Sequence, residues 1–167
     1  VLRQGGMKPS HYVGAEIPIL GTNAHWDAEG DLFVIEGDES DGTLVNFHPQ
    51  HSIVLNIEPE HLDFYADIEA IKTVFRQLLN QTPGYCVYCA EDPVAREVCG
   101  PHPLAVSYGW DRSFDFSARI LDMRPDQSDF DVYQNGTLLG QVTLEIPGKH
   151  NVSNSLAAIA LATRVGV

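Results

Sequence analysis

The residue types best suited to chemistry in this sequence are carboxylates and histidines that follow short apolar runs. Glu36 ends the run at residues 31–36, and His61 follows the run at residues 51–58. A carboxylate and an imidazole can share one divalent cation. Oxygen-rich sites with few protein ligands suit Mg²⁺, which keeps waters and takes further oxygens from a nucleotide. A single His after a strand is, however, more often a hydrogen-bonded structural residue.

A second polar group, at His150, Asn151 and Asn154, precedes an Ala-rich apolar segment. Asn151 and Asn154 are three residues apart at the start of an expected helix, so they share a face. Their amides could bind the donor and acceptor edge of a base. Capping of the helix by Asn and Ser explains the same residues equally well, because both types are favoured there.

The elements that must position these side chains follow from the apolar pattern. Four short aliphatic runs bounded by polar residues are typical of buried parallel strands, and they lie at residues 31–36, 51–58, 85–90 and 104–109. Helical spacing or capping signals predict three helices, at about 67–80, 92–99 and 150–166. This alternation predicts an α/β fold, with a mostly parallel sheet and flanking helices. Such sheets bind ligands at the carboxyl ends of their strands, where we expect Glu36 and His61 on adjacent strands.

The pattern changes to strict alternation between about residues 115 and 146, with a hairpin signal at Asn135-Gly136. We therefore expect a small antiparallel section there. The 167 residues fit one domain. The Cys86-x-x-Cys89 pair lies inside an apolar strand, where alternation places the two side chains on opposite faces. We interpret both cysteines as buried structural residues.

Charge excludes several classes of partner. Ten Lys and Arg face 23 Asp and Glu, for a net charge of -13. A nucleic-acid backbone or an anionic membrane surface requires the opposite balance, so neither is expected as a partner. There is no apolar run long enough to span a membrane and no signal-peptide pattern at the start. Together with only three cysteines, this predicts a cytoplasmic setting.

Three segments carry a resemblance to a known family. They are EGDESDG at residues 36–42, NIEPEHLD at 56–63 and GKHNVSNSLAA at 148–158. Each is weak alone, but their order and spacing together resemble the Mur ligase family over nearly the whole chain. The acidic form of the first two is similar to the alanine-adding branch. The implied fold is the three-layer α/β central, ATP-binding domain of that family, occupying residues 1–167.

The resemblance implies a role for each matched residue. Glu36 and His61 are expected to be catalytic Mg²⁺ ligands that bridge the γ-phosphate of ATP and the acceptor carboxylate. Asp38 and Ser40 are expected near the muramate end of the substrate. The third segment implies adenine contacts, from His150, Asn151 and Asn154.

The reaction that the resemblance implies is the ATP-dependent addition of L-alanine to UDP-N-acetylmuramate in bacterial peptidoglycan synthesis. The carboxylate would attack ATP to form an acyl phosphate, and the amine of L-alanine would then displace phosphate. Because the carboxylate and the triphosphate are both anionic, Mg²⁺ must neutralise them before they meet. Acidic clusters are therefore expected in this phosphate-handling enzyme.

The sequence departs from the family pattern in two ways. The phosphate loop G-x-x-G-K-[ST] would precede residue 1, and the C-terminal domain would follow residue 167. We therefore expect the N- and C-terminal domains of the same enzyme as partners, and we expect the isolated chain to be inactive. Arg76 stands where other members carry a modified Lys, which fits the alanine-adding branch.

Three alternatives stay open. One is a murein tripeptide-recycling ligase, a close relative with Tyr at the position of Ser40. Another is a ligase similar to folylpolyglutamate synthase, which is disfavoured because it predicts a modified Lys near Arg76. The third is a non-catalytic nucleotide-binding or interaction module, in which Glu36 and His61 are only structural.

Overall fold

The chain folds into two sheets, which a computed structural model describes over residues 1–167. The larger sheet has the strand order β4-β5-β6-β7-β8-β9, and the smaller has the order β2-β1-β3. The strands of the larger sheet are β4 Ser52–Val54, β5 Cys86–Cys89, β6 Ala105–Gly109, β7 Phe116–Arg124, β8 Gln127–Gln134 and β9 Thr137–Leu144. Those of the smaller sheet are β1 Ser10–Ile17, β2 Thr22–His25 and β3 Phe33–Ile35.

The larger sheet is parallel at one end and antiparallel at the other. The pairs β4–β5, β5–β6 and β6–β7 are parallel, and β7–β8 and β8–β9 are antiparallel. At the predicted hairpin turn, Asn135 and Gly136 have φ values of 49° and 76°, which Asn and Gly tolerate best. The α/β class with a small antiparallel section is thereby confirmed.

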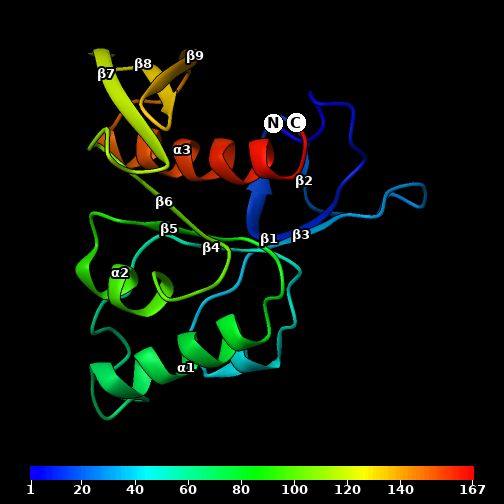
Figure 1. Cartoon of the computed structure of the whole chain (residues 1–167). Coiled ribbons are helices and arrows are strands. Elements are labelled where there is room, and N and C mark those ends of the chain that lie inside the picture. The colour runs from blue at the N-terminus through cyan, green and yellow to red at the C-terminus, as the bar shows by residue number, and fades with distance from the viewer.

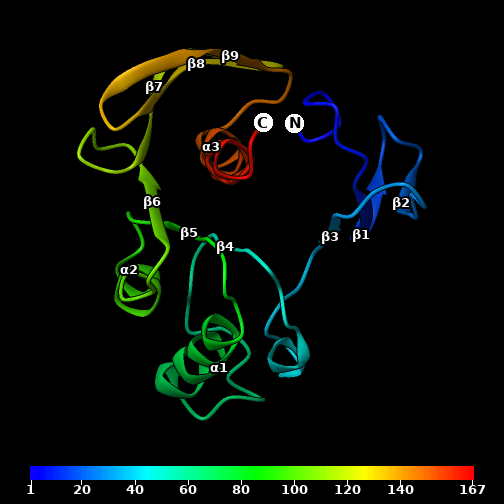
Figure 2. The same ribbon diagram turned by 45° about the vertical axis from the view of Figure 1, so that its right-hand side comes forward.

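Helices cover both faces of this sheet, as Figures 1 and 2 show. On one face lie α1 Ile68–Asn80 and α2 Pro93–Cys99, and on the other lies α3 Lys149–Arg164. Figure 2 shows α3 nearly along its axis, with the strands β7–β9 curving over it. The starts of α1 and α2 are fixed locally, because Asp67 and Asp92 each accept a hydrogen bond from a backbone N–H three residues later.

Two apolar cores lie on the two faces of the sheet. The first packs α1 and α2 against β4 and β5 and contains Cys86 and Cys99, and the second packs α3 against β5–β8. Cys86 belongs to the first core and Cys89 packs against the second, so the prediction that they face opposite sides is confirmed. None of the helices is both long and apolar enough to cross a membrane.

Two expectations about the run at residues 31–36 are wrong. The strand that it forms is exposed at all three residues rather than buried. The run at residues 31–36 forms β3, but β3 is not a neighbour of β4. It pairs in parallel with β1 instead, with Phe33 opposite Ser10 and Ile35 opposite Tyr12. A short strand can satisfy its backbone groups against any compatible edge, and the apolar pattern does not say which edge that is.

Candidate functional site

The site is built on the loop that follows β4. The parallel strands β4, β5 and β6 end at Val54, Cys89 and Gly109, so the loop at residues 55–67 starts from the carboxyl edge of the sheet. Within it His61 has a φ of 52°, a left-handed conformation that costs a non-glycine residue about 1–2 kcal/mol. A strained residue held in place by its surroundings is a feature of functional sites.

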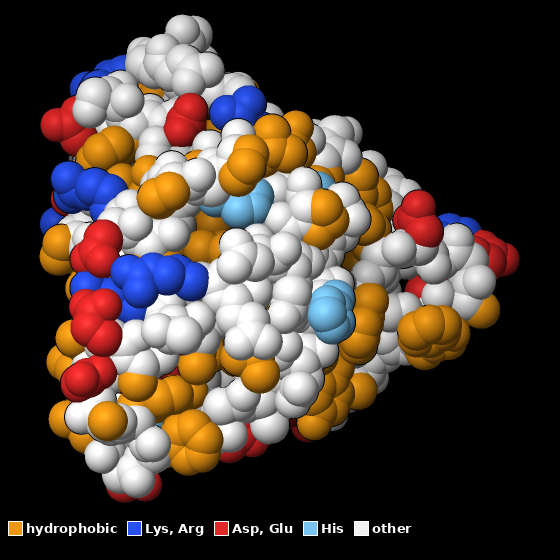
Figure 3. Space-filling view, turned by 60° about the horizontal axis from the view of Figure 1, so that its bottom comes forward, with side chains coloured by type: hydrophobic (Ala, Val, Ile, Leu, Met, Phe, Trp, Pro, Cys, Tyr) orange, Lys and Arg blue, Asp and Glu red, His pale blue; other side chains and the backbone are white.

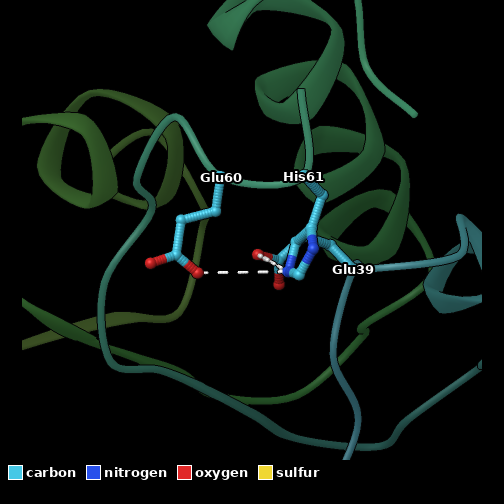
Figure 4. A group of neighbouring side chains, drawn as sticks. All are labelled: Glu39, Glu60 and His61. Carbon is cyan, nitrogen blue, oxygen red and sulfur yellow. Dashed lines mark ion pairs between the residues drawn. The ribbon is translucent and has the colours of Figure 1, made fainter. Parts of the chain in front are cut away.

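Two carboxylates converge on the His61 ring, as Figure 4 shows. The Nε2 atom of His61 lies 4.0 Å from Oε1 of Glu39 and 4.0 Å from Oε2 of Glu60. The three ligand atoms lie within 4.8 Å of one another. Glu60 is the chain neighbour of His61, whereas Glu39 comes from the acidic loop, residues 36–42, that follows β3.

The donor set of this group suits a hard divalent cation. Two carboxylate oxygens and one imidazole nitrogen, with open positions left for water and phosphate oxygens, are compatible with Mg²⁺ or Mn²⁺. The side chains of Glu39 and His61 are partly buried and that of Glu60 is exposed. A cation could therefore enter from the Glu60 side without a rearrangement of the fold.

The acidic loop that carries Glu39 is held by its own short side chains. Oδ1 of Asp38 accepts hydrogen bonds from the hydroxyl and the N–H of Ser40. Oδ1 of Asp41 accepts the same pair from Thr43. The hydroxyl of Ser40 contributes most to lowering the pKa of Asp38 below its ordinary value, so this carboxylate stays charged beside the site at neutral pH.

Neither acid of the group was predicted from the sequence as a cation ligand. Glu39 lies three residues after Glu36, and Glu60 lies directly before His61. Both belong to the segments that carry the family resemblance. The signal that could have identified them is their place in polar loops that directly follow predicted strands. The residue chosen instead was Glu36.

Glu36 lies apart from the group of three. It is exposed, and its Oε2 atom accepts a hydrogen bond from the N–H of Gly14 at 2.6 Å. This bond connects the end of β3 to β1, and Glu36 is not among the three residues whose ligand atoms converge. Its pairing with His61 at a metal stays a prediction.

The predicted group His150, Asn151 and Asn154 lies at the start of α3. His150 and Asn154 are exposed, and Nδ2 of Asn151 donates to the carbonyl of Pro147 at 2.6 Å. The N-cap residue is Gly148, which has no side chain to cap with, so capping by Asn or Ser is not what these residues do. Their contact with adenine stays a prediction.

The start of α3 and the His61 loop lie at the same edge of the sheet. The Lys149 ammonium sits 4.7 Å from the centre of the Trp110 ring, and Trp110 directly follows the carboxyl end of β6. The edge that carries His61 after β4 therefore also carries the first turn of α3. An open α/β sheet binds its ligands in this position.

Comparison with known proteins identifies the family. The Mur ligase middle domain matches residues 10–162. The chain is 41% identical over 170 residues to the UDP-N-acetylmuramate--L-alanine ligase of Sorangium cellulosum, covering all of this chain and 36% of that protein. It is 39% identical over 165 residues to the ligase of the same name from Syntrophobacter fumaroxidans, covering 97% of this chain and 35% of that protein.

Solved structures agree with the fold. The UDP-N-acetylmuramate-alanine ligase of Thermotoga maritima superposes with a TM-score of 0.84 at 24% identity, over 99% of this chain and 37% of that one. The UDP-N-acetylmuramate:L-alanyl-gamma-D-glutamyl-meso-diaminopimelate ligase of Neisseria meningitides gives a TM-score of 0.83 at 26% identity, over 99% of this chain and 56% of that one.

The matches cover all or nearly all of this chain but only part of each relative. The chain spans just over one third of the length of the two relatives, with 36% and 35% covered. Within that third the match is nearly end to end, and it includes both loops that carry Glu39, Glu60 and His61. The chain belongs to the Mur ligase family and corresponds to its middle domain.

Proposed function

We propose that this chain is the ATP-binding middle domain of an enzyme that joins L-alanine to UDP-N-acetylmuramate. Support comes from relatives of that name at 41% and 39% identity over essentially the whole chain. The observation that carries the mechanism is the convergence of Glu39 and Glu60 on His61 at the carboxyl edge of a parallel sheet.

In the proposed reaction a carboxylate oxygen of UDP-N-acetylmuramate forms a bond to the γ-phosphorus of ATP, and ADP leaves. The amine of L-alanine then bonds to the acyl carbon, and phosphate leaves with the electron pair of the broken C–O bond and takes up the proton that the amine releases. A divalent cation bound here would neutralise the charge between the triphosphate and the carboxylate. Both steps require the reacting groups to be held in place rather than any covalent bond to the protein.

The residues of this chain would share that task. Glu39, Glu60 and His61 would hold the cation, with Glu36 as a further candidate ligand from the same acidic loop. The ionised Asp38 carries a further negative charge on that loop, which would favour cation binding. We propose that Asp38, together with Ser40, lies near the muramate end of the substrate.

The first turn of α3 would bind the nucleotide base. We propose that His150, Asn151 and Asn154 contact adenine, because they lie at the start of a helix on the same sheet edge as the cation group. One donor of the Asn151 amide is engaged by Pro147. The side-chain carbonyl oxygen of Asn151 would then accept a hydrogen bond from the base.

The test uses the full-length protein and the variant His61→Ala. We expect ATP-dependent formation of UDP-N-acetylmuramoyl-L-alanine by the parent and a loss of at least about a hundredfold in the variant, because a lost metal ligand typically removes several kcal/mol of stabilisation. His48→Ala is the matched control, since His48 is exposed and outside the cation group. Equal activity of parent and His61→Ala would exclude this site.

The same assay separates the alternatives. Supplying tripeptide in place of L-alanine tests for a murein tripeptide ligase, and incorporation of tripeptide alone would replace our assignment. A full-length protein that binds ATP but forms neither product would be a nucleotide-binding module. We expect the 167 residues alone to form no product, and turnover by this chain would contradict that expectation.

A further inference from the structure

One residue, Tyr65, hydrogen-bonds to both loops of the proposed cation site. The N–H of Tyr65 donates to the carbonyl of His61 at 2.9 Å. The hydroxyl of the same residue donates to the carbonyl of Glu39 at 2.5 Å. Tyr65 thus contacts the backbone of one ligand from the loop after β4 and of another from the acidic loop. We propose that Tyr65 is a positioning residue, which sets the separation of Glu39 and His61 and thereby the affinity for a divalent cation.

Burial of Tyr65 makes this connection rigid. The residue is 5% exposed and belongs to the apolar core formed with α1 and α2. Its ring meets the ring of Phe64 edge to face, with 4.9 Å between centroids. A hydroxyl carried on a ring that is fixed in the core has few alternative positions. Its acceptor, the Glu39 carbonyl, is therefore held as well.

The acidic loop also packs against the same aromatic pair. Gly42, at the end of that loop, has a φ of 72°. A Cβ atom added there would lie 2.9 Å from two carbons of the Phe64 ring. Glycine suits this turn because it adopts a positive φ freely and leaves room for the Phe64 ring. Packing by Phe64 and hydrogen bonding by Tyr65 thus act on the same segment.

The hydroxyl keeps its proton over the physiological range. Burial, and then the negative charges of Glu39, Asp41 and Asp38, raise the pKa of Tyr65 above its ordinary value. A protonated hydroxyl can always donate to the Glu39 carbonyl.

The two acids of the cation group depend differently on this bond. Glu60 is attached to His61 by the chain itself, and it stays close whatever the acidic loop does. Glu39 lies 22 positions before His61 in the sequence, and the chain itself does not hold the two side chains together. Removal of the hydroxyl should therefore act on the cation through Glu39.

The test is the Kd for Mn²⁺ binding to the 167-residue chain, measured by electron paramagnetic resonance. We expect Tyr65→Phe to raise the Kd for Mn²⁺ roughly threefold to tenfold, which corresponds to the loss of one neutral hydrogen bond. The matched control is Tyr133→Phe. It removes a buried tyrosine hydroxyl that donates to Asp131 at 3.0 Å on β8, and it should leave the Kd unchanged.

A double-mutant cycle distinguishes positioning from general destabilisation. In a chain that carries Glu39→Gln, we expect Tyr65→Phe to have no further effect on the Kd, because its route to the cation is already removed. Additive effects of the two substitutions would overturn the inference. So would an equal Kd for the parent and Tyr65→Phe, or an equal loss in Tyr133→Phe.

The inference rests on the proposed cation site, and the outcomes separate the two. If the parent chain does not bind Mn²⁺, the cation site itself is wrong and the positioning role with it. If the parent binds and Tyr65→Phe binds equally, only the positioning role is wrong. Should Tyr65→Phe fail to fold, Gly42→Ala strains the same loop, because alanine is disfavoured at a φ of 72° and its Cβ would lie 2.9 Å from the Phe64 ring. That variant must also weaken Mn²⁺ binding, and an unchanged Kd would overturn the inference.

Discussion

At the scale of single residues, His61 combines a chemically useful side chain with a backbone conformation that favours glycine. Its φ of 52° is one of two positive values at non-glycine residues, the other being Asn135 in the hairpin turn. Asn, Asp and His occur in this region more often than other non-glycine residues. At His61 the backbone N–H groups of Phe64 and Tyr65 both donate to its carbonyl, which stabilises the turn.

This conformation predicts a conflict between stability and binding at position 61. We expect His61→Gly to be more stable than His61→Ala by about 1 kcal/mol, because glycine adopts positive φ without the Cβ clash that alanine keeps. Both variants should lose Mn²⁺ binding. Urea unfolding of the two chains measures the difference. Greater stability of His61→Ala would show that the left-handed turn is not retained in the folded protein.

The hydrogen bonds within the acidic loop make a second prediction. Ser40→Ala removes the hydroxyl that contributes most to lowering the pKa of Asp38. The pKa of Asp38 should therefore rise toward its ordinary value, which carboxyl ¹³C NMR titration would detect. The control is Ser113→Ala, which removes the side-chain contribution of Ser113 to the lowered pKa of Asp111 and keeps the larger contribution of its backbone N–H. It should move the pKa of Asp111 and leave that of Asp38 in place.

At the scale of elements, a small ionic network joins helices α1 and α2. Nζ of Lys72 on α1 lies 2.8 Å from Glu69 on the same helix and 2.8 Å from Glu97 on α2. Arg76 lies 3.1 Å from Glu97. Hydrogen bonds to Glu69 and Glu97 raise the pKa of Lys72, and the bond from Lys72 lowers the pKa of Glu97.

The directions of these shifts fix the pH range over which the network stabilises the fold. Because the pKa of Glu97 is lowered in the folded protein, its ion pair stabilises the fold above the unfolded pKa. This stabilisation is lost as the pH falls through the folded pKa. Because the pKa of Lys72 is raised in the folded protein, its ion pairs stabilise the fold below the unfolded pKa. This stabilisation is lost as the pH rises through the folded pKa. Full stabilisation therefore lies between about pH 5 and about pH 10.

Lys72→Met tests this range, because Met keeps the apolar stem and removes the charge. We expect the variant to unfold at lower urea than the parent at pH 7 and the difference to shrink toward zero near pH 3. Arg96→Met, at an exposed arginine of α2, is the control and should behave as the parent. A difference that persists at pH 3 would assign the effect to packing rather than to charge.

The helices and most strands were predictable because their signals are local. Asp67 and Asp92 cap helices at the positions expected from the sequence, and the turn at Asn135 depends only on its own two residues. The position of β3 was not predictable in the same way. Its three apolar residues fit a strand in any sheet, and only the full set of competing edges selects β1 as the partner.

At the scale of the whole molecule, the net charge of -13 acts on folding as well as on partners. In Figure 3 the Lys and Arg side chains gather mostly along the left side of the molecule, next to Asp and Glu side chains. Seven of the 23 acids lie within 4.0 Å of a Lys or Arg side chain, so most acids have no basic partner. Self-repulsion of this kind destabilises the compact state, and added salt reduces it.

This predicts that the chain becomes more stable with ionic strength. Raising NaCl from about 0.01 to about 0.15 M shortens the Debye length from about 30 Å to about 8 Å, and the Tm measured by calorimetry should rise. At matched ionic strength, Mg²⁺ should raise the Tm further, because ligand at about 100 times its Kd adds about 2.7 kcal/mol.

The variant His61→Ala separates the two effects of Mg²⁺. It should keep the rise in Tm with NaCl, since its formal charge at neutral pH is that of the parent. It should lose the additional rise with Mg²⁺ at matched ionic strength. An additional rise of the same size in His61→Ala would show that Mg²⁺ acts on the diffuse charge of the molecule and not at the proposed site.

The sequence by itself determined the fold class, the helix starts, the hairpin and the loop that carries His61. These features depend on hydrophobic period, on capping and turn residues, and on motifs that lie within about a dozen residues. Only the tertiary structure decided which carboxylates meet His61. Glu39 reaches it from another loop, through a turn at Gly42 and a hydrogen bond from Tyr65. Contacts of that kind depend on how separate segments pack, which no local pattern specifies.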